Sequence, residues 1–300
     1  MPVVELTEVT KAYESKVAVD RLSLSIQAGQ MFGLLGPNGA GKTSSIRMMM
    51  GITGPDSGSV RLFDKPFERP SLDRVGYLPE ERGLYKKMKV LDQLVFFGQL
   101  HGLAATEAQK RATGWAERLD ITSGLDKKVE ELSKGMQQKI QFIACLLHDP
   151  GLIVMDEPFS GLDPVNAVLL QDALLELKAE GRAILFSTHR MDQVEKLCDS
   201  ICLINNGQAV LSGNLREIKS HYERNRVIVE FEGSADFLTS AEIEEARNYS
   251  GHAEIKLTPH GDAQKLLHEA ASMATIYRFE IAEPSLEEIF IQTVGGKTHA

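Results

Sequence analysis

Apolar and polar residues alternate, or nearly alternate, in two segments at the start of the chain, residues 3–10 and 22–28. Such alternation predicts two half-buried strands, because successive side chains of a strand point to opposite faces. Residues 31–35 are almost wholly apolar and run directly into a glycine-rich turn, and helical spacing follows from about residue 43 to residue 50. A strand, a glycine turn and a helix in this order open a phosphate-binding α/β domain.

Helical and strand-like segments then alternate to about residue 204. A helical period over residues 90–120 is broken at Gly102, and residues 129–147 are again helical. Short apolar runs predict buried strands at 152–155, 183–186 and 201–204, with helices at 165–180 and 191–198. This alternation is typical of an α/β fold with a largely parallel sheet.

The pattern changes after about residue 220. Strands are predicted at 227–231, 253–258 and 275–281, and helices at 263–273 and from Ser285 onward, after Pro284. We therefore expect two domains: residues 1–220, with a helical subdomain at about 88–150, and a small α+β accessory domain, residues 221–300.

Charge and hydropathy limit where in the cell the protein is expected and which partners it is expected to bind. The net charge of −9 argues against a surface that coats nucleic acid, which would need clustered Lys and Arg. No apolar run approaches the roughly 18 residues needed to span a bilayer, and no secretory signal is visible at the N-terminus. We expect a cytoplasmic protein whose only membrane contact is through a partner.

The strongest chemical signal is a phosphate-binding loop. Residues 36–43 read Gly-Pro-Asn-Gly-Ala-Gly-Lys-Thr, which matches G-x-x-x-x-G-K-[ST] between a strand and a helix. The glycines let backbone N–H groups surround phosphates, and the helix N-terminus adds positive potential. Lys42 would contact the β- and γ-phosphates, and Thr43 would place its hydroxyl on Mg²⁺. The predicted nucleotide-binding residues of this loop are Gly36, Pro37, Asn38, Gly39, Ala40, Gly41, Lys42, Thr43 and Ser44.

An acidic pair ends the buried strand at 152–155. Asp156 emerges where ligands bind in such sheets and would hold Mg²⁺, directly or through water. Glu157 would orient and deprotonate the attacking water. No pattern of the kind that reads guanine is visible, so ATP is favoured over GTP. Tyr13 is interpreted either as a ring stacked on adenine or as a buried core side chain.

A third motif brings in a family. Residues 132–138, Leu-Ser-Lys-Gly-Met-Gln-Gln, resemble the signature motif of ABC ATPases, and with Lys42 and Asp156 the resemblance covers residues 3–220. It implies that Ser133, Gly135 and the helix N-terminus grip a γ-phosphate presented by another subunit. Ser133 is also a plain helix N-cap, and both roles are compatible.

Other positions resemble the family one by one. Residues 160–163 are similar to the loop through which two subunits communicate, with Asp163 as its acidic member. His189 follows an apolar strand, as does the family's switch histidine, which contacts γ-phosphate and orients water. Glu80 stands where the family usually has Gln; its carboxylate would still bind Mg²⁺ or its water, but adds negative charge beside the triphosphate.

The resemblance is greatest to bacterial type-2 ABC exporters, sodium- or drug-efflux ATPases among them. Residues 75–85 and 283–290 and the appended C-terminal domain carry it. It implies a homodimer, or a pair with a sister ATPase subunit, that closes on ATP and drives a separate membrane permease. Residues after Glu80, including Arg82, Leu84 and Tyr85, would lie near the groove for the permease. The alternative is a non-transport ABC ATPase acting on ribosomes or DNA.

Overall fold

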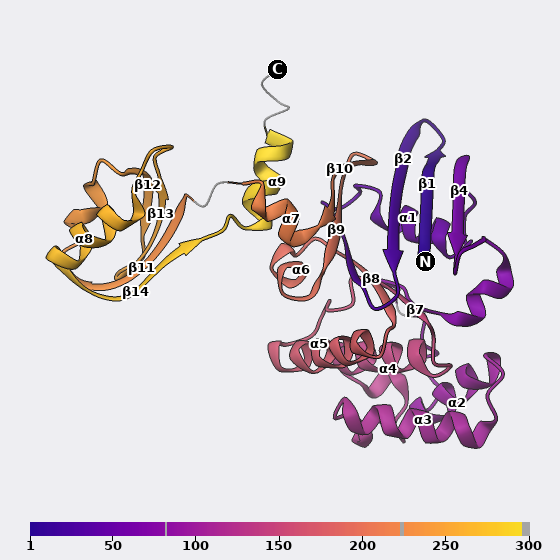
Figure 1. Cartoon of the computed structure of the whole chain (residues 1–300). Helices are drawn as coiled ribbons and strands as arrows, with labels where there is room; N and C mark the ends of the chain where they lie inside the picture. Colours follow the sequence, from indigo (N-terminus) through magenta and orange to yellow (C-terminus); the bar gives the residue numbers. More distant parts are fainter. Residues whose placement is uncertain (82, 223–224, 296–300) are drawn as a thin grey trace. The chain divides into compact units, whose positions relative to one another are not determined.

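The computed structural model describes residues 1–81, 83–222 and 225–295. The chain divides into two compact units, Met1–Leu215 and Arg216–Ala300, whose elements are drawn in Figure 1.

The first unit is built on two sheets. One sheet is antiparallel, with the strand order β2-β1-β4-β5, and contains β1 (Pro2–Tyr13), β2 (Lys16–Gln27), β4 (Ser57–Leu62) and β5 (Lys65–Pro66). The other has the order β10-β9-β3-β8-β7-β6 and contains β3 (Met31–Leu35), β6 (Val75–Leu78), β7 (Leu152–Asp156), β8 (Ala183–Thr188), β9 (Ser200–Asn205) and β10 (Gln208–Asn214). Its strands are parallel except β10, which is antiparallel to β9.

A single apolar core joins these two sheets. It contains Leu6 and Ile26 from the antiparallel sheet, Leu34 and Val154 from the parallel strands, and Ile46 from α1 (Lys42–Met49). Every residue of β3 and of β7 is buried, as is typical of parallel strands that are covered on both faces. The helix that follows the glycine loop is therefore anchored in the core.

The remaining helices of this unit are α2 (Val90–Leu100), α3 (Ala105–Arg118), α4 (Lys134–Leu146), α5 (Pro164–Ala179), α6 (Met191–Leu197) and α7 (Leu215–Ser220), which continues past the unit boundary. Helices α2, α3 and α4 pack against one another, and short 3-10 turns occupy Arg69–Arg74, Thr122–Gly124 and Val129–Glu131. Gly102 has φ +82° and separates α2 from α3, as the broken helical period predicted.

The second unit is a four-stranded antiparallel sheet with the order β12-β13-β11-β14. Its elements are β11 (Arg226–Gly233), a 3-10 turn (Asp236–Thr239), β12 (Ile243–Asn248), β13 (His252–Leu257), α8 (Ala263–Met273), β14 (Ala274–Ala282) and α9 (Leu286–Gly295). Leu266 and Ala270 of α8 lie in one apolar cluster with Val227, Val229 and Ile255 of the sheet.

The predicted fold class, an α/β unit with a mixed sheet and helices followed by a small α+β unit, is confirmed. Strands β4, β5, β6, β10 and β12 were not predicted. Within the part of the chain that the structure describes, none of the helices combines the length and apolar character that crossing a bilayer requires.

Candidate nucleotide site

The loop between β3 and α1 requires glycine at two positions. Gly36 has φ +151°, and a Cβ built on it would lie 2.2 Å from the carbonyl oxygen of Ile204. Gly41 has φ +117°, and its Cβ would lie 2.4 Å from the carbonyl oxygen of Ala18. Any side chain would push the loop off the neighbouring backbone, so the loop's path depends on these residues.

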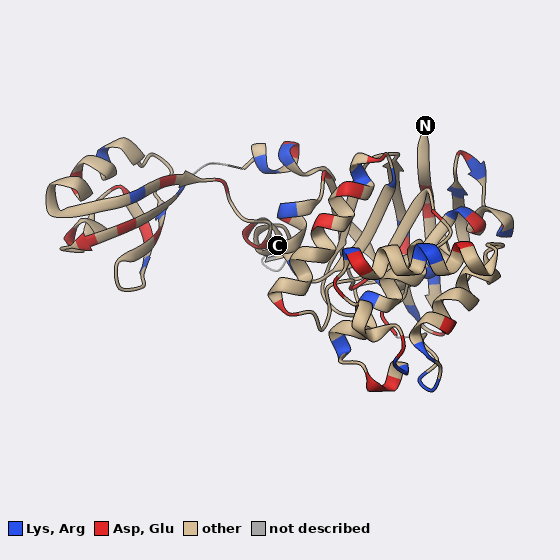
Figure 2. Ribbon diagram, turned by 90° about the horizontal axis from the view of Figure 1, so that it is seen from below, with Lys and Arg blue, Asp and Glu red and all other residues tan. Residues whose placement is uncertain are grey.

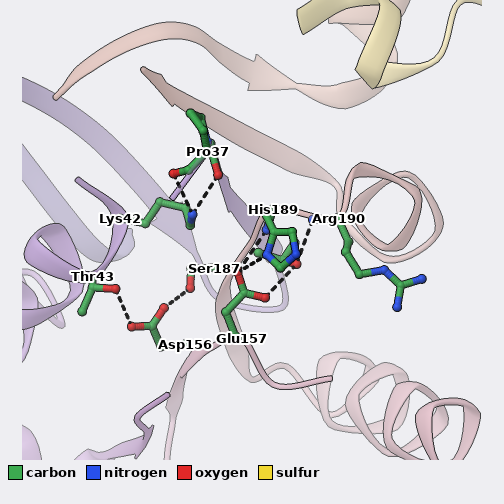
Figure 3. Close-up of polar contacts among 10 residues, drawn as sticks. Pro37, Lys42, Thr43, Asp156, Glu157, Ser187, His189 and Arg190 are labelled. Carbon is green, nitrogen blue, oxygen red and sulfur yellow. Dashed lines mark hydrogen bonds and ion pairs between the residues drawn. The ribbon is translucent and has the colours of Figure 1, made fainter. Parts of the chain in front are cut away.

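Lys42 is buried at the start of α1, with only 6% of its surface exposed. Its Nζ donates hydrogen bonds to the carbonyl oxygens of Gly36, at 2.7 Å, and Pro37, at 3.2 Å (Figure 3). Burial lowers the pKa of Lys42 because it disfavours the charged form. Nearby carboxylates oppose this lowering of the pKa, in decreasing order Glu157, Asp156 and Glu80.

Asp156 ends β7 and is 2% exposed. The Thr43 hydroxyl donates to its Oδ2 at 2.8 Å, and the Ser187 hydroxyl donates to its Oδ1. Ser187 lies opposite Asp156 in the parallel register of β7 and β8. The carboxylate of Asp156 and the hydroxyl of Thr43 are hard oxygen ligands, the type that Mg²⁺ takes, so the residues fit a magnesium-bound nucleotide.

The Glu157 side chain points toward the C-terminal end of β8. The residue adopts φ +51°, in the left-handed region that few non-glycine residues enter. Its Oε1 accepts the backbone N–H of His189 at 3.1 Å and lies 2.8 Å from Nδ1 of the same residue. The Thr188 hydroxyl donates to Oε2 at 3.2 Å. The carboxylate and the imidazole therefore form one hydrogen-bonded pair, as Figure 3 shows.

One cavity of about 490 Å³ gathers most of the predicted binding residues. The predicted site residues that line it are Tyr13, Asn38, Gly39, Gly41, Lys42, Thr43, Ser44, Glu80, Asp156 and Glu157. Tyr13 is 40% exposed, so the alternative of a buried core tyrosine is wrong. No three of the His, Cys, Asp and Glu side chains among the described residues are placed to form a metal cluster by themselves.

The other predicted residues do not line this cavity. Gly36 and Pro37 contribute carbonyl oxygens to Lys42, while the Ala40 side chain is buried in the core. His189 joins the site only through Glu157, and its side chain is 54% exposed.

The signature segment lies outside this cavity. Ser133 caps α4, because its hydroxyl accepts the N–H of Met136 at 3.2 Å. Asp163 caps α5 in the same way through the N–H of Asn166, at 3.0 Å. A Cβ on Gly135 would lie 3.5 Å from the carbonyl oxygen of Gly161, so the signature segment and the loop at 160–163 are neighbours.

Sequence reasoning missed several contributors, among them the Thr188 hydroxyl that donates to Glu157. The Ser187 hydroxyl donates to Oδ1 of Asp156, the oxygen that Thr43 does not contact. Lys16 also lines the cavity. Buried Gln138 on α4 donates to the carbonyl oxygen of Pro158 at 2.9 Å, which ties the signature helix to the Asp156-Glu157 loop. The position of Ser187 in the Ser-Thr-His run was a usable signal, since it ends a buried strand. Lys16 has no local signature, and Gln138 belongs to the motif at 132–138, which does not reveal its bond to Pro158.

The fold and this site define a P-loop nucleotide-binding protein. Residues 19–160 match the family model for ABC transporter, and residues 213–294 match the C-terminal domain of ATP-binding protein DrrA1-3-like. The uncharacterized ABC transporter ATP-binding protein YhaQ of Bacillus subtilis is 45% identical over 97% of this chain and 98% of its own length. Nod factor export ATP-binding protein I of Ralstonia nicotianae is 38% identical over 73% of this chain and 70% of its own length.

Solved structures agree. The ATP-binding subunit of an ABC transporter, 28% identical, covers 73% of this chain and 92% of its own with a TM-score of 0.68. A nucleotide-free ATP-binding cassette from an ABC transporter, also 28% identical, covers 73% and 94% with a TM-score of 0.65. The chain belongs to the family of ABC transporter ATP-binding proteins and is therefore an ATPase subunit of a transporter.

Proposed function

We propose that this chain is the ATP-hydrolysing subunit of an exporter, and that two ATPase subunits close around MgATP to drive a separate membrane permease. One observation carries the proposal. The paired carboxylates at the end of β7 are held by residues at the end of β8, beside the glycine loop: Asp156 by Ser187, and Glu157 by His189.

The nucleotide would occupy the cavity that Lys42 and the glycine loop line. Backbone amides and the Lys42 ammonium would bind the phosphates, and the exposed ring of Tyr13 would stack on adenine. Thr43, Asp156 and Glu80 would hold Mg²⁺, directly or through water; the ion would neutralise phosphate charge. A relative of known structure, 27% identical, is described in its ADP conformation, which supports this assignment.

Glu157 would act on the attacking water. Its Oε1 and Oε2 both accept hydrogen bonds, from His189 and Thr188, which fix the direction of the carboxylate. A carboxylate fixed in this way orients a water and takes up its proton. His189, whose side chain is largely exposed, would contact the γ-phosphate and keep Glu157 in position.

A second subunit would complete the site. Ser133, Gly135 and Asp163 are predicted nucleotide contacts that lie outside both the glycine loop and the cavity of their own chain. Ser133 satisfies one amide at the start of the 13-residue helix α4, and the remaining amides there favour an anion. We infer that a homodimer or a pair with a sister subunit places this helix end against the partner's nucleotide.

The permease contact would lie beside residues 83–85. An apolar cavity of about 320 Å³ is lined there by Leu84, Phe97, Leu100 and Cys145 among others, and none of its described lining residues is Lys, Arg, Asp or Glu. Such a surface fits the apolar side of a cytoplasmic helix of the permease. Arg82, which was assigned to the same contact, lies outside the described residues.

Transport is favoured over action on ribosomes or DNA by the names of the relatives. One relative is named for Nod factor export, and the solved structure of cbiO1 from Clostridium perfringens, 25% identical, is described as part of an ABC transporter complex. Both names support a transporter subunit, and the first supports export in particular.

The variant Glu157→Gln tests the mechanism. Removing the base should slow ATP hydrolysis by about 10²–10⁴-fold, and ATP-bound dimers should accumulate because closure is no longer followed by hydrolysis. Light scattering with and without ATP, beside phosphate release, measures both. Glu68→Gln removes an exposed carboxylate elsewhere and should change neither. Normal hydrolysis by Glu157→Gln would remove this residue from its proposed role.

A further inference from the structure

The charged side chains that line the nucleotide cavity are unbalanced. Among the described residues two are basic, Lys16 and Lys42, and three are acidic, Glu80, Asp156 and Glu157. A cavity that must receive a triphosphate therefore has more carboxylates than ammonium groups. An amide in place of Glu80 would leave equal numbers of basic and acidic side chains.

Asp156 and Glu157 have structural partners that Glu80 does not share. Asp156 accepts two hydroxyl hydrogen bonds and Glu157 is paired with His189. Glu80 is exposed at the cavity wall and lies two residues after the end of β6. It nevertheless acts on the phosphate-binding ammonium, because its charge is one of the three that favour the protonated form of Lys42.

The effect on a nucleotide depends on whether a cation comes with it. A free triphosphate carries about two more negative charges than its Mg²⁺ complex, so the carboxylate of Glu80 repels the free form more strongly. The same carboxylate attracts the bound cation, for which it is a better ligand than an amide. Both effects favour binding of the Mg²⁺ complex over binding of the free triphosphate. At separations of several ångströms near a protein surface, such a charge changes an affinity by roughly tenfold.

We propose that Glu80 is a specificity-determining residue that makes the nucleotide cavity prefer the divalent-cation complex of the nucleotide over the free triphosphate, by about tenfold. The inference rests on the proposed function, since it concerns the same cavity. Its consequence is that free Mg²⁺ affects the first step, nucleotide capture, as well as hydrolysis.

The experiment compares binding of a fluorescent, slowly hydrolysed ATP analogue to the full chain in excess Mg²⁺ and in EDTA. The measured quantity is the ratio of the dissociation constant in EDTA to that in Mg²⁺. In Glu80→Gln this ratio should fall about tenfold relative to the natural chain. Glu80→Asp, which keeps the charge, should retain most of the ratio of the natural chain.

Glu81→Gln is the matched control. It removes the same charge one residue away, from an exposed side chain that does not line the cavity, and should leave the ratio unchanged. An unchanged ratio in Glu80→Gln, or an equal fall in Glu81→Gln, would overturn the inference while leaving the nucleotide site intact. Failure of the natural chain to bind the analogue even with Mg²⁺ would instead overturn the proposed function, and this inference with it.

Discussion

The two units of this chain bury different kinds of side chain. In the first unit the buried set includes polar residues such as Lys42, Gln138, Asp156 and Ser187, and every buried polar side chain of the described residues lies there. The cluster that forms the core of the second unit is apolar throughout. Burial of a polar group costs free energy unless it is hydrogen-bonded. The first unit therefore gives up some stability by burying the polar side chains of its nucleotide site.

Surface charge differs as well. Residues 1–220 carry 26 Lys and Arg against 28 Asp and Glu, whereas residues 221–300 carry 7 against 14, so most of the net negative charge belongs to the smaller segment. Figure 2 marks these positions along the chain. In the second unit many charges form exposed pairs such as Lys256 with Glu244. The comparison shows that the charged side chains of the nucleotide site belong to the first unit, whereas charged side chains of the second unit lie at its surface.

The largest expected effect breaks the second unit alone. Phe237 is 1% exposed, and its ring centroid lies 4.8 Å from that of Phe231 in the apolar cluster. Phe237→Ala should lower the free energy of unfolding of this unit by about 3–5 kcal/mol. Hydrogen exchange should rise across the unit, while ATP affinity is retained because the first unit has its own core. Tyr277→Ala, at a 66% exposed position of the same unit, should leave exchange nearly unchanged. Equal loss of ATP affinity in Phe237→Ala would show that the units fold as one.

The next effect is confined to the first unit. Lys42→Met keeps the length of the side chain but removes the buried ammonium, and should weaken ATP binding by about a hundredfold, or about 2.7 kcal/mol. Isothermal titration measures it, and exchange in the second unit should not change. Lys65→Met, in the exposed strand β5, serves as the control. Undiminished affinity in Lys42→Met would place the nucleotide elsewhere.

Acidification should separate the units by pH. The His148 ring stacks on His101 with centroids 3.8 Å apart, and burial, with the neighbouring imidazole, lowers the pKa of His148 to about 4. The unfolded chain then binds more protons below about pH 6.5, so this histidine's contribution is complete above that pH and is lost as pH falls toward 4. Allowing for partial solvent exposure, the first unit should lose about 1 kcal/mol by pH 5.

The second unit should respond in a lower window. A hydrogen bond from Lys265 lowers the pKa of Glu242, so its stabilising contribution is present above the ordinary glutamate pKa and is lost only below it. Thermal unfolding followed separately in each unit at pH 7 and pH 5 checks the difference. His148→Gln should flatten the response of the first unit, and His260→Gln, at an exposed position of the second, should not. Equal destabilisation of both units between pH 7 and pH 5 would contradict the assignment.

The smallest expected effect concerns the boundary between fold and function within the first unit. Ser133→Ala removes the cap of α4 and should cost about 1 kcal/mol of stability. If the cap also faces a partner's nucleotide, ATP-induced dimers should weaken by more than this loss explains, which light scattering at several concentrations measures. Asp262→Ala removes the cap of α8 in the second unit, away from the nucleotide site, and gives a matched comparison. Dimers of normal strength in Ser133→Ala would limit Ser133 to capping.

Local chemistry determined what the sequence could reveal. The glycine loop is contiguous, and its glycines, Lys42 and Thr43 are required by the geometry of one short segment, so its spacing alone predicted a phosphate site. Asp156 and Glu157 were equally readable because they end a run of four apolar residues. The break in the helical period at Gly102 likewise predicted an interruption where α2 ends and α3 begins. The acidic pair and this break can both be read from the sequence because each depends only on neighbouring residues.

Tertiary structure decided the rest. Glu244, Glu245 and Arg247 have side chains that favour helix, yet they lie in β12, because pairing with β13 overrides local preference. Ser187 supports Asp156 only because β8 lies beside β7, although 31 residues separate the two in the sequence. Whether Tyr13 was core or cavity wall depended on which surfaces remained uncovered after packing. Sequence spacing reports contacts along the chain, whereas these contacts arise from the free energy of packing segments that are distant along it.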